Sequence, residues 1–210
     1  MKALIFDFDG TIADTFFIAV DVFRKLADGR HDSGDEEIEE LRSLPARDAI
    51  RRVGARWWHL PYILYYARKE VKRRQDEIKP IKGVPEVLAE LRNRGYRLFI
   101  VSSNSTKNVN RFLHNNELGD CFSDAYGNIG IFAKSGGLRK IAKEHHLKIE
   151  DCCYIGDEAR DVEAARRAEM SCISVSWGYN NMTGLKRGNP EKIISKPKEL
   201  LDIFKDRRTK

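Results

Sequence analysis

The feature that most constrains the fold is a series of short apolar runs separated by segments with helical patterning. Five such runs occur, at residues 2–7, 97–103, 152–157, 171–176 and, most briefly, 193–194. Continuous apolar runs of this length are typical of strands buried on both faces of a sheet. The segments between them predict helices at residues 85–95, 107–115, 136–146, 160–168 and from about 197 onward. Strands that alternate with helices indicate βαβ units, so the sequence predicts an α/β fold with a parallel sheet flanked by helices.

Three of the four longer runs end at Asp7, Ser103 and Asp157, all of which are polar. In an open parallel sheet, ligands bind beyond the carboxyl ends of the strands. We therefore expect these three side chains to converge at one edge of the sheet.

The stretch from residue 15 to residue 80 breaks the alternation. It is rich in Arg and Glu, is mostly helical in pattern, and contains a polar joint at residues 29–35. One interpretation is that it belongs to the main core, but its length between two strands favours a separate subdomain. We predict a small all-helical cap at residues 15–80, and a core domain made of residues 1–14 and 81–210. Trp57 and Trp58 belong to an aromatic cluster of the cap, where packing in the cap interior is the favoured role and lining a substrate face is the alternative.

Composition excludes several classes of protein. Hydrophobic residues make up 41% of the 210 residues, which is ordinary for a globular chain. No apolar run approaches the roughly 20 residues that span a bilayer, and acids at the N-terminus argue against a secretion signal. The four cysteines lack Cys-x-x-Cys spacing, which favours buried thiols and a cytoplasmic protein. The net charge of +6 indicates a solvated surface or a face that favours anionic substrates, and nucleic-acid binding is not expected.

Asp7 and Asp9 follow the first apolar run in the sequence Phe-Asp-Phe-Asp-Gly-Thr. Carboxylates at positions i and i+2 project to the same side if the backbone stays extended. One could attack a phosphorus atom while the other moves protons at the leaving and entering oxygens. Gly10 and Thr11 then allow a tight turn with exposed amides. The alternative, a solvated strand end, is weakened because the pair follows a buried strand.

Further candidate groups follow the other strands. Ser103 and Asn104 could offer a hydroxyl and backbone amides to an anionic oxygen, although a simple turn is the alternative. Lys134 precedes a helix and could neutralise a phosphoryl group, or could be solvated. Asp157 and Asp161 lie at a strand-to-helix turn and suit a hard cation such as Mg²⁺, while an acid that caps the helix is the alternative.

In this order the pieces resemble the haloacid dehalogenase superfamily of phosphatases. The first motif corresponds to residues 7–11, the second to Ser103, the third to Lys134, and the fourth to residues 156–157 with Asp161. Further similarity at residues 81–85, 177–180, 189–190 and 193–194 indicates the phosphoglycolate phosphatase-like branch. The resemblance covers about two-thirds of the chain and implies a Rossmann-like core with a helical cap that closes over the site.

The resemblance also implies a mechanism and site residues. Asp7 would attack phosphorus and become a transient aspartyl phosphate, and Asp9 would protonate the leaving group and then activate water. The implied phosphate-binding residues are Thr11, Ser103, Asn104 and Lys134. The implied Mg²⁺ ligands are Asp7, Asp9 through its backbone carbonyl, Asp157 and Asp161.

The resulting hypothesis is a Mg²⁺-dependent phosphatase that acts on a small phosphorylated metabolite. Within the superfamily a dehalogenase is disfavoured because that branch lacks the second aspartate, which is present here as Asp9. A phosphomutase shares all four motifs and stays an alternative, as does a catalytically idle binding protein with the same fold. The sequence predicts neither the physiological substrate nor the oligomeric state.

Overall fold

The structure is a computed structural model, which describes residues 2–26, 34–52, 54–130 and 132–206. Its central element is a six-stranded parallel sheet with the strand order β3-β2-β1-β4-β5-β6. The strands are β1 (Ala3–Phe6), β2 (Arg97–Val101), β3 (Asp124–Tyr126), β4 (Cys152–Gly156), β5 (Ser171–Val175) and β6 (Lys192–Ile194). The predicted α/β fold with a parallel sheet flanked by helices is therefore confirmed. Strand β3 was not predicted, because its three residues do not form an apolar run.

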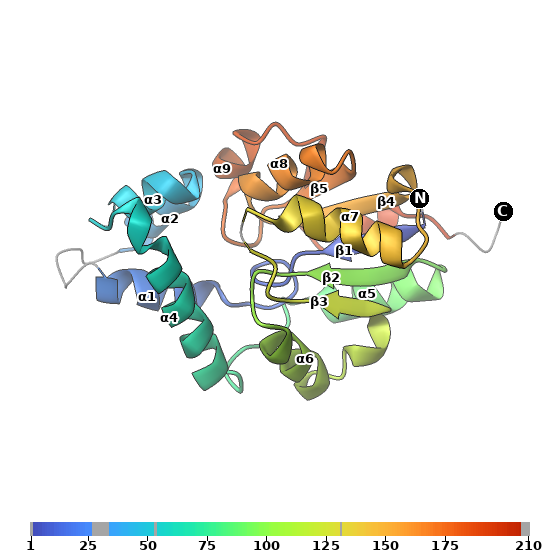
Figure 1. The fold of residues 1–210 in the computed structure, drawn as a ribbon, viewed down its shortest axis with the longest axis horizontal. Coiled ribbons are helices and arrows are strands. Elements are labelled where there is room, and N and C mark those ends of the chain that lie inside the picture. The colour runs from blue at the N-terminus through green and yellow to red at the C-terminus, as the bar shows by residue number, and fades with distance from the viewer. Residues whose placement is uncertain (1, 27–33, 53, 131, 207–210) are drawn as a thin grey trace.

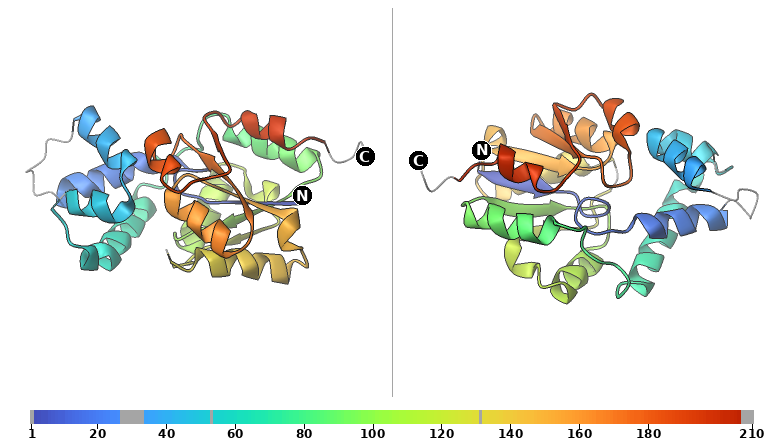
Figure 2. Two further views of the ribbon diagram at one scale, coloured as in Figure 1. Left: turned by 90° about the horizontal axis from the view of Figure 1, so that it is seen from above. Right: turned by 180° about the vertical axis from the view of Figure 1, so that it is seen from behind.

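Helices cover both faces of this sheet (Figures 1 and 2). One face packs against α5 (Val84–Asn93), α6 (Thr106–Asn115) and α10 (Glu199–Ile203), and the other against α7 (Lys134–Glu144) and α8 (Ala159–Arg167). Alternate residues of each strand supply the two layers, so Leu4 and Phe6 lie in one and Ala3 and Ile5 in the other. A short helix, α9 (Met182–Lys186), follows β5 and was not predicted.

Between β1 and α5, the described residues form only helices and the segments that connect them. The helices are α1 (Phe16–Leu26), α2 (Asp35–Ser43), α3 (Ala46–Arg52), the 3₁₀ turn η1 (Trp57–His59) and α4 (Leu60–Arg73). Figure 1 shows this group, called the helical insert below, to the left of the sheet. Residues 29–33 of the predicted polar joint at residues 29–35 lie outside the described residues.

The chain enters and leaves the helical insert through adjacent segments. The Asp14 N–H donates to the Lys79 carbonyl at 2.9 Å, and the Ile81 N–H donates to the Ile12 carbonyl at 2.9 Å. A β-bridge between Ala13 and Pro80 completes this contact. Two connecting segments bonded side by side are compatible with a separate subdomain, and the proposed division at residues 14/15 and 80/81 stays a prediction.

One expectation about the insert is wrong. Trp58, assigned to the cap interior, is 66% exposed, and Tyr62 and Tyr65 are exposed as well. For Tyr62 and Tyr65 the reason is the orientation of α4, whose inward face carries Ile63 and Val71, spaced by two helical turns. The side chain of Trp57 lies outside the described part of the structure.

The structure agrees with the prediction of buried thiols for three of the four cysteines. Cys152, Cys153 and Cys172 are buried free thiols, and Cys121 is a half-buried one. Within the described residues, no helix combines the length and apolar character that crossing a membrane requires.

Candidate active site

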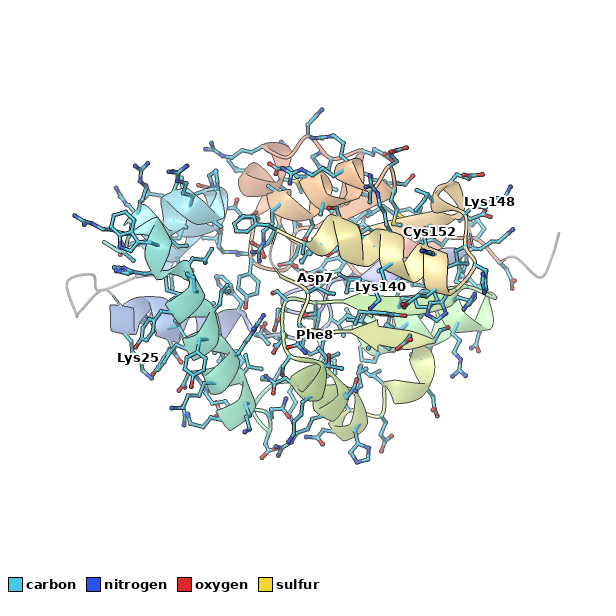
Figure 3. All side chains as sticks on the ribbon, viewed as in Figure 1. Asp7, Phe8, Lys25, Lys140, Lys148 and Cys152 are labelled. Atoms are coloured by element: carbon cyan, nitrogen blue, oxygen red, sulfur yellow. The ribbon has the colours of Figure 1, made fainter. Side chains whose placement is uncertain are left out.

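The candidate site begins where β1 ends. Asp7 directly follows the strand and is buried, and its N–H donates to the Ile155 carbonyl of β4 at 2.8 Å. The chain then turns tightly, because the Phe8 carbonyl accepts the N–H groups of Ile12 and Ala13. Figure 3 shows Asp7 and Phe8 between the sheet and the helical insert. The fold therefore presents Asp7 at the edge of the sheet that faces the insert.

Gly10 is required in this turn for two reasons. Its φ of +78° is in the left-handed region, which is costly for residues with a Cβ atom. A Cβ at this position would also lie 2.3 Å from Asp157 Oδ2 and 2.5 Å from the Tyr179 ring. The turn after Asp7 can therefore pack against Asp157 only because residue 10 has no side chain.

Lys134 pairs with two of the candidate carboxylates. Its Nζ donates to Asp7 Oδ2 at 2.5 Å and to Asp161 Oδ1 at 2.6 Å, and its side chain is only 1% exposed. The Tyr154 hydroxyl donates to the same Asp161 oxygen at 3.2 Å. Lys134 is thus a buried cation held between two anions, and the alternative of a solvated lysine is excluded.

Asp161 also caps helix α8. Its Oδ2 accepts the Glu158 N–H at 3.1 Å, and Glu158 in turn accepts from the Asp161 N–H, which completes a capping box. The capping role and the site role therefore coexist in one side chain, because its two oxygens face different partners.

Asp157 is fixed by residues from two loops. Its Oδ1 accepts the Thr11 hydroxyl at 2.7 Å, and its Oδ2 accepts the Tyr179 N–H at 2.7 Å. The hydroxyl of Thr11, which the sequence suggested for phosphate binding, is therefore used here to orient Asp157. Tyr179 belongs to the segment at residues 177–180, which the sequence singled out without a role.

Asp7, Asp157 and Asp161 form one cluster. An oxygen of each carboxylate lies within 4.8 Å of the others, and all three residues are buried. Hard cations such as Mg²⁺ prefer oxygen ligands of this kind. Three carboxylates also outnumber the ammonium of Lys134, which bonds Asp7 and Asp161, so a divalent cation fits the charge of the site. The carboxylate of Asp9 is not part of this cluster.

Burial dominates the electrostatics of the cluster. It raises the pKa of Asp7 to about 7, against the lowering effect of the Lys134 ammonium. Burial, and then the Asp7 carboxylate, raise the pKa of Asp157 well above its usual range. For Lys134 burial alone would lower the pKa, yet the Asp161 and Asp7 carboxylates hold it above its ordinary value. The ionised forms of Asp7 and Asp157 therefore require nearby positive charge.

Asp9 lies apart from the cluster and has its own partner. Both of its carboxylate oxygens accept from Asn104 Nδ2, each at 3.1 Å. Burial raises the pKa of Asp9, while the hydrogen bond from Asn104 opposes this shift. The Asn104 backbone N–H, suggested for phosphate binding, donates to Ser102 Oγ at 2.9 Å. In this structure Asn104 is thus a partner of Asp9.

A cavity of about 200 Å³ lies between the core and the insert. Its core side includes Asp7, Asp9, Ser103 and Asn104, and its insert side is mostly aliphatic. Three arginines also line it, and these are Arg42, Arg68 and Arg160. The sequence analysis assigned no role to them, because arginines are common on this chain and only the fold brings these three to one cavity.

Comparison with known proteins assigns the class. A model of the haloacid dehalogenase-like hydrolases matches residues 4–175. The chain therefore belongs to this family of hydrolases, and the family resemblance and the enzyme class predicted from the motifs are confirmed.

The chain is also similar to individual phosphatases and to solved structures of the family. A phosphoglycolate phosphatase from Synechococcus elongatus is 32% identical over 203 residues, which cover 96% of this chain and 96% of the relative. A phosphoglycolate phosphatase from Pseudomonas savastanoi is 25% identical over 95% of this chain and 78% of its own length. A haloacid dehalogenase-like hydrolase from Streptococcus pneumoniae shares the fold with a TM-score of 0.79, at 21% identity and with 98% of this chain and 99% of the other covered.

Proposed function

We propose that this protein is a cytoplasmic Mg²⁺-dependent phosphatase that hydrolyses a small anionic phosphate monoester through an aspartyl phosphate on Asp7. The observation that carries the proposal is the position of Asp7, which bonds to the buried Lys134 and borders the cavity together with Asp9. The nucleophile and a separate acid therefore border one space, and a charge-neutralising group is bonded to the nucleophile.

The mechanism follows from the properties of these side chains. An oxygen of Asp7 attacks phosphorus in line and forms an acyl phosphate, while the ester oxygen departs with a proton from Asp9. Asp9, now ionised, takes a proton from water, and the resulting hydroxide attacks the phosphorus of the acyl phosphate. Inorganic phosphate leaves and the Asp7 carboxylate is restored.

Charge neutralisation makes the first step feasible, because a phosphate dianion repels a carboxylate. Lys134 supplies one positive charge at 2.5 Å from the Asp7 carboxylate. A Mg²⁺ ion held by Asp7, Asp157 and Asp161, with the Asp9 carbonyl, would supply charge neutralisation at the transferred phosphoryl group. Ser103, which borders the cavity, completes the residues that we assign to the phosphoryl site.

The cavity supports an anionic substrate of small size. Its volume of about 200 Å³ suits a metabolite, and Arg42, Arg68 and Arg160 border it. Together with the 32% identical phosphoglycolate phosphatase, this favours a phosphorylated carboxylic acid such as phosphoglycolate. A phosphomutase is the alternative, since a protein of Thermotoga maritima described as a candidate β-phosphoglucomutase has the same fold, with a TM-score of 0.67 at 20% identity.

A substrate panel that includes phosphoglycolate and an aryl phosphate, with and without Mg²⁺, tests the proposal. Turnover should require Mg²⁺, and Asp7→Asn should reduce it by roughly 10⁴-fold or more, because removing a nucleophile removes the covalent route. Asp14→Asn, the same change at an exposed site, is the matched control and should leave turnover intact.

Three outcomes would contradict the proposal. Full activity of Asp7→Asn would remove Asp7 as the nucleophile. Phosphoryl transfer to a second sugar phosphate rather than to water would identify a mutase. Absence of turnover across the panel would favour the idle binding protein.

A further inference from the structure

The side chain of Asn104 is held in one orientation. Its Oδ1 accepts the Ser105 N–H at 2.8 Å and Asn108 Nδ2 at 2.9 Å. Two donors at the oxygen leave the NH₂ group facing the other way, where it donates to both oxygens of Asp9. Asn104 and Asn108 are both buried, so water does not compete for the bond between them. The direction of the Asn104 amide, and with it the support of Asp9, thus depends on the Ser105 N–H and on the side chain of Asn108.

Asn108 is connected in turn to the helical insert. Its Nδ2 donates a second hydrogen bond to the Arg68 carbonyl of α4 at 3.3 Å. Its own carbonyl accepts from Gln75 Nε2, just beyond α4, at 3.0 Å. The Arg68 guanidinium also donates to the Ser103 carbonyl, next to Asn104. Helix α4 therefore contacts both ends of the segment at residues 103–108, which contains Asn104, the partner of Asp9.

We propose that Asn108 is a positioning residue, which acts through Asn104 to hold the Asp9 carboxylate for proton transfer when α4 is seated on the core. The inference rests on the proposed function, because it assigns a partner to the proposed acid–base residue. A proton-transfer group must lie within hydrogen-bonding reach of the oxygen that it serves. The bonds from Asn104 hold both oxygens of Asp9. The bond from Asn108 to the Arg68 carbonyl makes this support depend on contact with the insert.

Asn108→Asp isolates this role, because it keeps the size and shape of the side chain and removes both donors. The new carboxylate attracts the NH₂ group of Asn104, which turns the amide oxygen toward Asp9. The substituted position is in the first turn of α6, where an acid is favourable to the helix, and this offsets part of the cost of burying the new charge.

The readout is kcat/KM for two esters with different leaving groups, since this constant reports the steps up to departure of the leaving group. An alkyl phosphate needs a proton from Asp9 as it leaves, whereas a nitrophenyl phosphate releases a stable phenolate. Asn108→Asp should lower kcat/KM for the alkyl ester by about 30-fold, part of the roughly 10²–10⁴-fold that acid–base catalysis contributes. For the nitrophenyl ester kcat/KM should change by less than about 3-fold, since that ester makes little use of the acid.

Asn110→Asp is the matched control, because Asn110 lies on the exposed face of the same helix. It should leave both constants unchanged, and thermal unfolding should show that both variants are folded. If Asn108→Asp does not fold, Asn108→Ala, a change to a good helix former, should give the same difference between esters.

The outcomes separate the two proposals. An equal loss for both esters, or no loss for the alkyl ester, would overturn the positioning role while wild-type hydrolysis sustains the proposed function. Failure of the wild-type protein to hydrolyse either ester would instead remove the proposed function on which the inference rests.

Discussion

The core and the helical insert meet at the same cavity but are organised differently. In the core, Asp7, Asp157 and Lys134 are buried side chains that bond to one another or to fixed loops. The insert reaches the core mainly through main-chain acceptors, because Arg42 donates to the Gly178 carbonyl at 2.8 Å and Arg68 donates to the Ser103 carbonyl. A side-chain pair requires two particular residues, whereas a carbonyl acceptor is present whatever the residue. Sequence motifs therefore predict the chemical groups of the core, whereas they do not predict which residues of the insert contact the core.

The first way to test this difference is to remove the buried cation of the core. Lys134→Met leaves the carboxylates of Asp7 and Asp161 without their ammonium partner. Breaking a buried ion pair in this way costs about 3–5 kcal/mol, so we expect a loss of that order in the free energy of unfolding. Turnover should also fall sharply. Denaturant unfolding and the phosphatase assay measure the two effects.

Lys140→Met on the same helix is the control (Figure 3). Lys140 is 56% exposed, pairs with Glu144 at 3.8 Å and lies 5.5 Å from the centre of the Tyr126 ring, so its loss should change stability by no more than about 1 kcal/mol. The deficit of Lys134→Met should shrink below pH 7, because burial raises the pKa of Asp7 to about 7 and a protonated Asp7 does not need the ammonium. If Lys134→Met were as stable as the wild type at pH 7, Lys134 would not be the buried cation that stabilises the carboxylates of Asp7 and Asp161.

The second test uses two glycines with the same backbone conformation. Gly10 in the core has a φ of +78°, and Gly54 in the insert has a φ of +77°. A Cβ at residue 10 meets Asp157 and Tyr179, whereas a Cβ at residue 54 meets no atom within 4 Å. Gly54→Ala should cost only the left-handed backbone penalty of about 1 kcal/mol, and Gly10→Ala should cost about 3 kcal/mol because overpacking adds to it.

Unfolding in urea gives both values, and the phosphatase assay should show a large loss for Gly10→Ala alone, since Asp157 is displaced. Equal costs at the two positions would mean that the contact with Asp157 yields easily. The close packing around Gly10, which has no counterpart around Gly54, would then contribute nothing to the cost of the substitution.

The sequence was sufficient for the sheet and for the candidate residues at its edge, because buried parallel strands leave long apolar runs that end in Asp7, Ser103 and Asp157. It was not sufficient for β3, whose residues Asp124–Tyr126 join the sheet through backbone bonds to β2 rather than through apolar character. Edge strands of this kind are specified by the neighbouring strand.

The partners of the site residues were also beyond the sequence. Asn104 follows a strand, which suggested a phosphate ligand, but whether its amide faces a ligand or Asp9 depends on Asn108 four residues later and on α4. Such choices depend on which hydrogen-bonding groups remain unpaired after folding, and a linear pattern does not contain that information.

The smallest expected effect concerns the exposed aromatic residues of the insert. The Trp58 side chain is in contact with Arg56, whose guanidinium lies 5.0 Å from the ring centre, and an exposed cation–π pair contributes about 0.5–1 kcal/mol. We therefore expect Trp58→Ala to lower the free energy of unfolding by no more than about 1 kcal/mol and to leave turnover unchanged. In the core, Phe112 is buried and its ring lies 5.1 Å from that of Phe8, so Phe112→Ala should cost about 3–5 kcal/mol. Denaturant unfolding of both variants measures the contrast. An exposed pair contributes about 1 kcal/mol, so a loss above 2 kcal/mol for Trp58→Ala would place this ring in the interior of the insert. The packing of the insert would then resemble that of the core.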